Sequence, residues 1–335
     1  MKSKVLILVF LCCFISLAVR AQDFHIAQYD AFNLYLNPAL TGNYLGESGD
    51  YKVSSVYRTQ WRALTPKPYT TYGVSYDMPY KKFGIGGYLL DNRSGVGNFN
   101  TLDFQGSGSY FITDPKTSPH ILTTGIQLGL FYKTYNPNKL LFESQYDYST
   151  NSLNPDIASG ENFQRMQKLN FDANMGFFYK YRDLQKKWRP YVGLSLFHVN
   201  RPNEAFMGNK SKLPIRWVAQ AGCDFIVNEK LTLTPMILYM NQAKASELNL
   251  GVLSYYRLND DKDLRYDLIV GANYRVKDAF IMQLGIKKDN LVLRMSYDVN
   301  TSYLNRYTNG KGGFELTLQV IGFKGKPVFG TTAKF

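Results

Sequence analysis

A length of 335 residues allows two average domains or one large one, and all-β barrels of this size often form a single domain. The chain is 45% hydrophobic and 15% aromatic, with a mean hydropathy of -0.27, which agrees with strands that turn one face to water. After the first residues, no apolar run approaches the roughly 18 residues of a membrane-spanning helix, so the composition argues against a helical membrane protein.

The formal net charge is +13, and it falls to +10 without Lys2, Lys4 and Arg20 because the first 21 residues contain no acid. A basic balance can indicate nucleic-acid binding. Here, however, lysine and arginine are spread over expected turns and inward positions, with no run of five or more. We therefore expect a solvated lumen and contacts with anionic outer-membrane lipid, and no nucleic-acid partner.

The start of the chain has the three parts of a secretory signal peptide. Lys2 and Lys4 are basic, residues 5–19 are apolar, and Ala21 is a small residue at the end of this stretch. We expect residues 1–21 to be a signal peptide with cleavage after Ala21. A retained membrane anchor is the alternative, but the apolar run is short for a spanning helix.

Residues 22–50 do not have the pattern of a membrane strand. Asn37-Pro38 followed by Thr41-Gly42 is turn chemistry, and the aromatic residues before it lack a two-residue period. We expect an N-terminal plug or docking segment on the periplasmic side.

From Tyr51 onward, apolar or aromatic residues alternate with small or polar ones. The clearest case is Leu169 to Tyr181, in which every second residue is apolar or aromatic and forms one face of a strand. The pattern recurs about fourteen times with aromatics near the strand ends, which is typical of outer-membrane barrels. The expected strands are 51–59, 70–78, 83–90, 102–111, 121–133, 169–181, 191–199, 215–225, 231–240, 247–256, 265–275, 279–287, 291–298 and 314–322.

The gaps between these strands alternate in length. Gaps after odd-numbered strands include 91–101, 134–168, 199–213 and 299–313, whereas those after even-numbered strands include 79–82, 227–230 and 288–290. Outer-membrane barrels have short periplasmic turns and long outer loops. The sequence therefore predicts an all-β, antiparallel, up-and-down transmembrane barrel over 51–323, and the tail 324–335 is either a periplasmic extension or the closing strand.

Many charged side chains fall on the inward face. They are expected either to pair with one another inside a filled lumen or to line a selective pore, and their mixed signs favour the filled lumen. These residues are Lys52, Arg58, Asp77, Lys133, Asp172, Lys180, Arg216, Asp224, Arg265, Asp267, Arg275, Arg294, Asp298 and Glu315.

The sequence does not predict an enzyme. His25, His120 and His198 have no partners at the spacing of a metal site or a catalytic triad, and we expect each to be an interfacial or surface residue. Ser195 lies within a strand and lacks the second glycine of a nucleophile elbow. We therefore expect no catalytic residues, no cofactor and no metal.

Several motifs together resemble the PorP/SprF family of type IX secretion membrane proteins. The first and most specific follows the signal peptide, and the resemblance extends over the whole mature chain. Phe314 stands where the family commonly has histidine. The motifs are Gln28-Tyr29 with Leu34 to Ala39 and Gly42; Tyr57 to Trp61; Gly84 to Tyr88 with Asp91, Asn92 and Gly95; and Ser296 to Asn300 with Leu304, Tyr307 to Gly310 and Gly313 to Leu316.

The resemblance implies an outer-membrane barrel of Bacteroidetes-type bacteria that helps to export or anchor a secreted surface protein, such as an adhesin used in gliding motility. The outer loops would contact this client, and the N-terminal segment would contact periplasmic or lipoprotein components of the machinery. A porin-like diffusion channel for a small solute is the alternative. The candidate partner-binding residues are Tyr35, Asn37, Pro38, Trp61, Asn300, Tyr303 and Tyr307.

Overall fold

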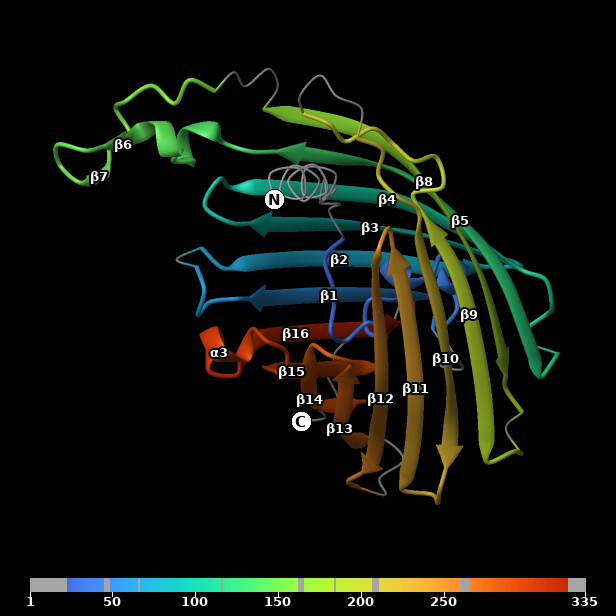
Figure 1. Cartoon of the computed structure of the whole chain (residues 1–335). Helices are drawn as coiled ribbons and strands as arrows, with labels where there is room; N and C mark the ends of the chain where they lie inside the picture. Colours follow the sequence, from blue (N-terminus) through green and yellow to red (C-terminus); the bar gives the residue numbers. More distant parts are fainter. Residues whose placement is uncertain are drawn as a thin grey trace, which may run out of the picture.

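The computed structural model describes residues 23–44, 49–65, 67–115, 117–161, 166–183, 185–206, 211–259 and 265–324. Fourteen antiparallel strands form one closed barrel, in which each strand pairs with its neighbours in the chain and β1 pairs with β16 (Figure 1). The barrel strands are β1 (Tyr51–Gln60), β2 (Tyr69–Tyr80), β3 (Phe83–Ser94), β4 (Phe99–Phe111), β5 (His120–Thr134), β8 (Gln167–Tyr181), β9 (Trp188–Phe197), β10 (Arg216–Ile226), β11 (Leu231–Gln242), β12 (Ala245–Arg257), β13 (Tyr266–Arg275), β14 (Ala279–Lys288), β15 (Leu291–Asn300) and β16 (Lys311–Gly322).

The two ends of the barrel differ in the length of their connections. One end carries short turns such as 81–82, 227–230 and 289–290, and the other carries the long loops 135–166, 198–215 and 301–310. We call these the short-turn end and the long-loop end. The predicted loop over 91–101 is wrong, because β3 and β4 continue as a paired hairpin from Ser94 to Phe99.

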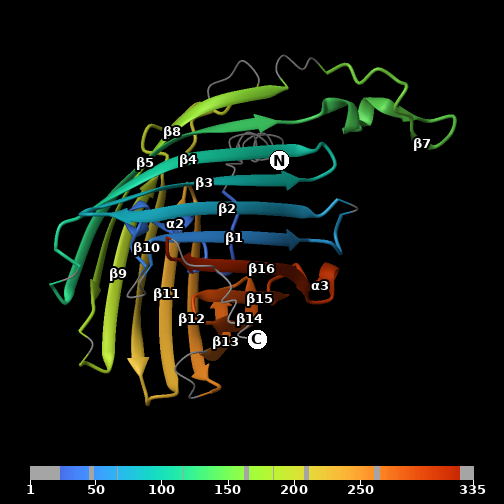
Figure 2. The ribbon, with the colours of Figure 1, turned by 180° about the vertical axis from the view of Figure 1, so that it is seen from behind.

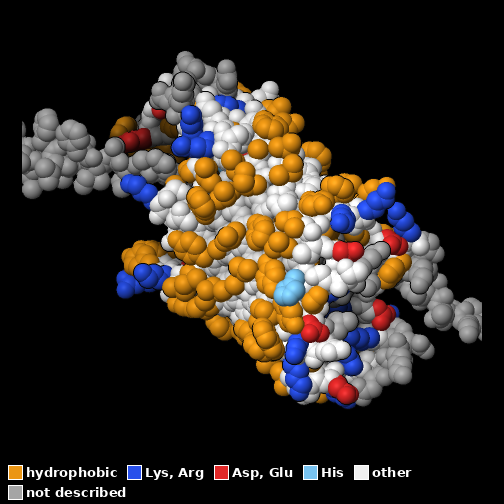
Figure 3. Space-filling view, turned by 90° about the vertical axis from the view of Figure 1, so that its right-hand side faces the viewer, with side chains coloured by type: hydrophobic (Ala, Val, Ile, Leu, Met, Phe, Trp, Pro, Cys, Tyr) orange, Lys and Arg blue, Asp and Glu red, His pale blue; other side chains and the backbone are white. Residues whose placement is uncertain are grey.

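The alternation in the sequence places apolar side chains on the outside of the barrel. Val74, Ile126 and Met282 are among the many large apolar residues that are exposed on the outer wall. Hydrophobic side chains cover the middle of the visible flank, and most charged side chains lie toward its ends (Figure 3). Closure of the sheet satisfies the backbone hydrogen bonds that hydrocarbon cannot satisfy.

Residues 23–44 lie inside the barrel and are hereafter called the plug. The plug contains a single helical turn, α2 (Asn33–Leu36), and a 3-10 turn, η1 (Pro38–Leu40) (Figure 2). Asn37 initiates η1, because its side-chain oxygen accepts a hydrogen bond from the amide of Ala39 at 2.9 Å, and Pro38 occupies the first position, where no amide is needed.

The long loops contain the remaining elements. Loop 135–166 holds η2 (Pro137–Lys139), η3 (Glu143–Gln145) and a two-stranded sheet of β6 (Tyr146–Asp147) and β7 (Ser152–Leu153), which projects from the barrel (Figure 1). Loop 301–310 holds α3 (Asn305–Thr308). The predicted signal peptide 1–21, and all of the predicted tail 324–335 except Lys324, lie outside the described residues.

Candidate functional site

The Asn37-Pro38 dipeptide fits against two glycines on adjacent strands. A Cβ atom on Gly125 of β5 would lie 2.4 Å from the carbonyl oxygen of Pro38, and one on Gly176 of β8 would lie 2.0 Å from the side-chain oxygen of Asn37. The side-chain nitrogen of Asn37 donates hydrogen bonds to the backbone carbonyls of Phe177 and Leu194, at 3.0 and 3.3 Å. The motif thus joins the plug to both β8 and β9.

Inward polar side chains hold the plug through its backbone. Gln127 of β5 donates to the carbonyl of Leu34 at 2.7 Å, and Ser195 of β9 donates to that of Leu36 at 2.8 Å. The plug forms no sheet of its own, so its buried backbone carbonyls need other hydrogen-bond donors. The inward side chains supply these donors in place of water. The plug is therefore bonded to the barrel wall by polar contacts that match its backbone.

A buried ionic cluster fixes the other side of the plug. Glu315 of β16 accepts hydrogen bonds from the amides of Ala27 and Gln28, at 2.7 and 2.8 Å, and from Arg58 of β1 at 3.1 Å. Arg58 also pairs with Asp298 of β15 at 2.6 Å. The expectation that inward charges pair with one another is confirmed for these residues.

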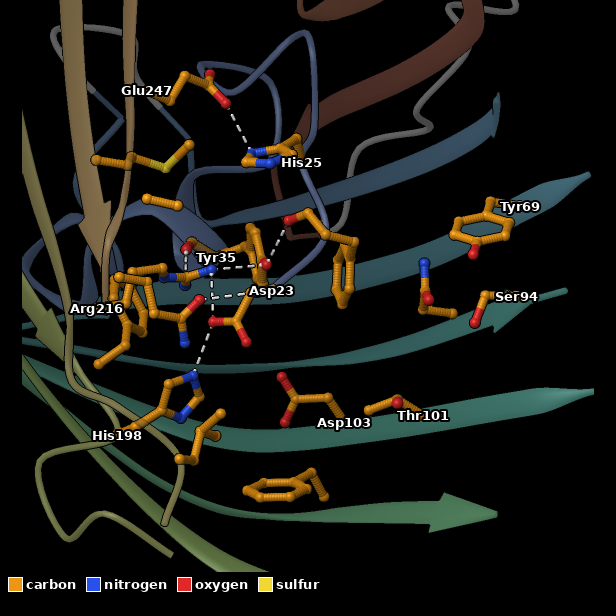
Figure 4. Close-up of a pocket in the computed structure, with 18 of the residues that line it drawn as sticks. Asp23, His25, Tyr35, Tyr69, Ser94, Thr101, Asp103, His198, Arg216 and Glu247 are labelled. Carbon is orange, nitrogen blue, oxygen red and sulfur yellow. Dashed lines mark hydrogen bonds and ion pairs between the residues drawn. The ribbon is translucent and has the colours of Figure 1, made fainter. Parts of the chain in front are cut away.

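Above the plug, the lumen widens into a cavity of about 820 Å³ near the long-loop end, hereafter the vestibule (Figure 4). Asp23, Phe24, His25 and Tyr35 of the plug line one side of it, and residues from strand ends and loop 198–215 line the rest. Its lining combines aromatic side chains with many charged and polar ones. Concave sites of this size are where ligands usually bind.

Asp23 anchors the start of the plug to the vestibule wall. Its carboxylate lies 2.8 Å from Nε2 of His198 and 3.1 Å from Arg216, and Nδ1 of His198 lies 2.9 Å from Asp172 (Figure 4). Burial disfavours the charged form of His198, but the carboxylates of Asp23 and Asp172 outweigh it and raise its pKa to about 9. Burial likewise opposes ionisation of Asp23, but His198 and Arg216 hold its pKa well below the ordinary value.

The structure divides the seven predicted partner-binding residues into two groups. Tyr35, Asn37 and Pro38 lie in the plug, where Asn37 and Pro38 are buried against the wall and the ring of Tyr35 stacks on Phe24 with centroids 5.1 Å apart. These three could contact a partner only from within the lumen or after the plug moves.

The other four predicted residues lie at the long-loop end. The ring of Trp61 packs edge-on against Tyr69 at the vestibule mouth. Asn300 is buried and donates to Thr308 and to the carbonyl of Lys311, both at 3.1 Å, so it supports the loop rather than facing outward. Tyr303 and Tyr307 are 65% and 61% exposed. Partner binding by the seven residues stays a prediction.

Sequence reasoning missed the Asp23–His198 cluster. The expectation that His198 is an interfacial or surface residue is wrong, because its side chain is buried between two carboxylates. No local motif marks this pairing, since Asp23 and His198 are 175 positions apart in the chain. Arg216 was recognised only as an inward charge.

Two kinds of feature are absent from the described part of the chain. No group of three or more histidine, cysteine or acidic side chains there could hold a metal ion. Within the same residues, no helix has the length and apolar character needed to cross a membrane.

The closed barrel, with an apolar outer wall and a polar lumen, defines an outer-membrane β-barrel protein. The family model described as type IX secretion system membrane protein PorP/SprF matches residues 18–320. The chain therefore belongs to the PorP/SprF family, which is a family of secretion-system membrane proteins and not an enzyme class. No match is found among the curated proteins.

Solved structures with a similar fold are distant in sequence. The toluene transporter TbuX of Ralstonia pickettii is 12% identical, with a TM-score of 0.48 over 85% of this chain and 92% of its own. The toluene transporter TodX of Pseudomonas putida is also 12% identical, with a TM-score of 0.46 over 90% and 93%. CdiB from Acinetobacter baumannii is 9% identical, with a TM-score of 0.45 over 82% and 60%.

Proposed function

We propose that this barrel is a non-enzymatic component of the type IX secretion system that helps to export or anchor a secreted surface protein. The observation that carries the proposal, together with family membership, is the bonded plug inside the lumen. Because its own chain occupies the lumen, such a barrel would bind its partners at its exposed ends rather than conduct through an open channel.

The long-loop end is the surface we assign to the secreted client, for example an adhesin used in gliding motility. Tyr303 and Tyr307 are exposed there, and aromatic side chains are enriched at protein interfaces. The short-turn end is assigned to periplasmic or lipoprotein components of the machinery, because outer-membrane barrels direct their short turns to the periplasm.

Deletion of the gene should abolish surface display of the client, and the wild-type gene should restore it. A double variant, Tyr303→Ser with Tyr307→Ser, should reduce display without reducing the amount of folded barrel. Tyr76→Ser removes a tyrosine that is 47% exposed on the outer wall of β2, away from both ends of the barrel, and serves as the control. Normal display in the deletion strain would contradict the proposal.

The vestibule supports a second candidate function, a diffusion channel for a small solute. Conduction would require the plug to leave part of the lumen. A steady current from the wild-type protein in planar bilayers would favour the channel. Silence of the wild type, together with current after deletion of residues 23–44, would favour the closed anchor.

A further inference from the structure

The charge of the vestibule is opposite to that of the chain. The whole sequence has a formal net charge of +13, yet three lysine or arginine residues line the vestibule, namely Lys133, Arg216 and Arg275. Its lining carboxylates are Asp23, Asp103, Asp172, Glu204, Glu247 and Asp278. With low-dielectric walls around it, such a cavity attracts cations even in a basic protein.

Each cation that lines the vestibule is already bound to a carboxylate of the chain. Arg216 pairs with Asp23 at 3.1 Å, Lys133 pairs with Glu204, and Arg275 pairs with Asp278. The two histidines are also engaged, since His198 contacts Asp23 and Asp172, and His25 contacts Glu247 at 2.7 Å. These pairs include every carboxylate that lines the vestibule except one.

That remaining acid is Asp103 of β4. It makes no ion pair with a lysine or arginine among the residues that the structure describes. The hydroxyl of Tyr88 and the side-chain amide of Gln105 donate hydrogen bonds to it, at 2.9 and 2.8 Å. These neutral donors orient the carboxylate but supply no positive charge, and Figure 4 shows it directed into the open part of the vestibule.

Aromatic side chains stand beside this carboxylate. Phe131 of β5 is the direct cross-strand partner of Asp103, so both side chains lie on the inward face about 5 Å apart at Cβ. Tyr88 lies on the other side, on β3, and its ring also lines the vestibule. The corner thus combines a carboxylate with two rings, the groups that hold cations by charge and by cation–π attraction.

The vestibule already contains one complete example of this arrangement. The guanidinium of Arg216 lies 4.5 Å from the ring of Tyr35 and 4.2 Å from that of Phe197, while it pairs with Asp23. At the Asp103 corner, the cations beside Phe131 pair with other carboxylates. The ammonium of Lys133 lies 5.3 Å from the ring of Phe131 and pairs with Glu204, and the ring of His198, 6.3 Å from that of Phe131, pairs with Asp23 and Asp172. An external cation can therefore bind Asp103 without displacing an internal ion pair.

We propose that the Asp103 corner of the vestibule binds one alkylammonium or guanidinium group, with the apolar stem of the ligand against Phe131 and Tyr88. Two sources carry this chemistry: a lysine or arginine side chain of an extended protein segment that enters from the long-loop end, or a free small amine. The proposal does not rest on the secretion role, because binding of the group is measurable without a client.

Isothermal titration of the full, detergent-solubilised barrel at neutral pH tests the proposal with two probe pairs. The first pair is Nα-acetyl-lysine methylamide and its Nε-acetylated, uncharged analogue. The second pair is an extended peptide with one central lysine and the same peptide with that lysine acetylated. Both charged probes should bind more tightly than their neutral partners if a free amine suffices, and only the peptide should do so if the segment is required.

The variant Asp103→Asn keeps the shape of the corner and removes its charge. It should weaken binding of the charged probe about tenfold or more, because a hydrogen bond to a charged group contributes that much. Asp103→Ser, with a shorter side chain, should give the same result and guards against misfolding of one variant. Asp91→Asn on β3 is the matched control, since Asp91 pairs with Arg93 outside the vestibule.

Unchanged affinity in both Asp103 variants would overturn the proposal. Equal binding of the charged and acetylated probes would do the same, as would failure of both charged probes to bind the wild type at millimolar concentration.

Discussion

Glu315 connects the plug to the barrel wall, and the variant Glu315→Gln is expected to release the start of the plug. The carboxylate is fully buried and faces three donors: the amides of Ala27 and Gln28, and Arg58. A glutamine has one acceptor oxygen and presents its NH2 group to at least one of these donors. The substitution therefore removes the negative charge and places the glutamine NH2 group against another hydrogen-bond donor, in a site that water does not reach.

The magnitude follows from the bonds that join Glu315 to the plug. Arg58 and Glu315 both belong to the barrel wall, so loss of their ion pair affects the docked and the released state alike. The docking equilibrium depends on the two amide bonds from Ala27 and Gln28, and because a hydrogen bond to a charged group contributes about 1.5–3 kcal/mol, a loss of about 3 kcal/mol is expected. This free energy corresponds to roughly a hundredfold shift in the equilibrium between the docked and the released plug.

Thiol labelling measures that shift. Ala27 is completely buried, so a cysteine placed there by Ala27→Cys, in a Cys223→Ser background, should react slowly with a maleimide in the mature barrel. Glu315→Gln should raise the labelling rate by up to about a hundredfold, as the released fraction rises. Asp224→Asn is the control, because Asp224 pairs with Lys180 and bonds Thr234 away from the plug. Labelling as slow as in the parent would refute the reasoning.

Two further predictions concern pH and packing. The pKa of His198 rises from 6.5 to about 9 on folding. Its contribution to the free energy of unfolding is therefore complete below about pH 6.5 and is lost as the pH rises through about 9. Urea unfolding in detergent should show this loss, on the order of 3 kcal/mol, in the wild type and not in His198→Gln. Gly125→Ala should destabilise the plugged barrel by about 1–3 kcal/mol, because the added carbon meets the backbone of Pro38. Gly106→Ala, whose added carbon meets its nearest atom at 3.6 Å, should leave the unfolding midpoint nearly unchanged, and equal effects of the two substitutions would contradict the packing argument.

The two-residue period determined the barrel, because a strand that faces lipid on one side and a polar lumen on the other must alternate. The predicted ranges 169–181 and 279–287 agree with β8 and β14 within two residues. The prediction of a loop over 91–101 was wrong. Gly, Asn and Asp residues weaken the strand pattern of the sequence there, although the two strands remain paired.

Only the tertiary structure decided which inward groups meet. The sequence placed Arg58, Asp298 and Glu315 on the inward face, but closure of the sheet brings β1 beside β16 and makes them one cluster. The partners of Asp23 and the fit of Asn37 against Gly176 likewise depend on residues that are far apart in the chain. Alternation is a local property of each strand, whereas pairing across a lumen depends on register and closure, which no local pattern encodes.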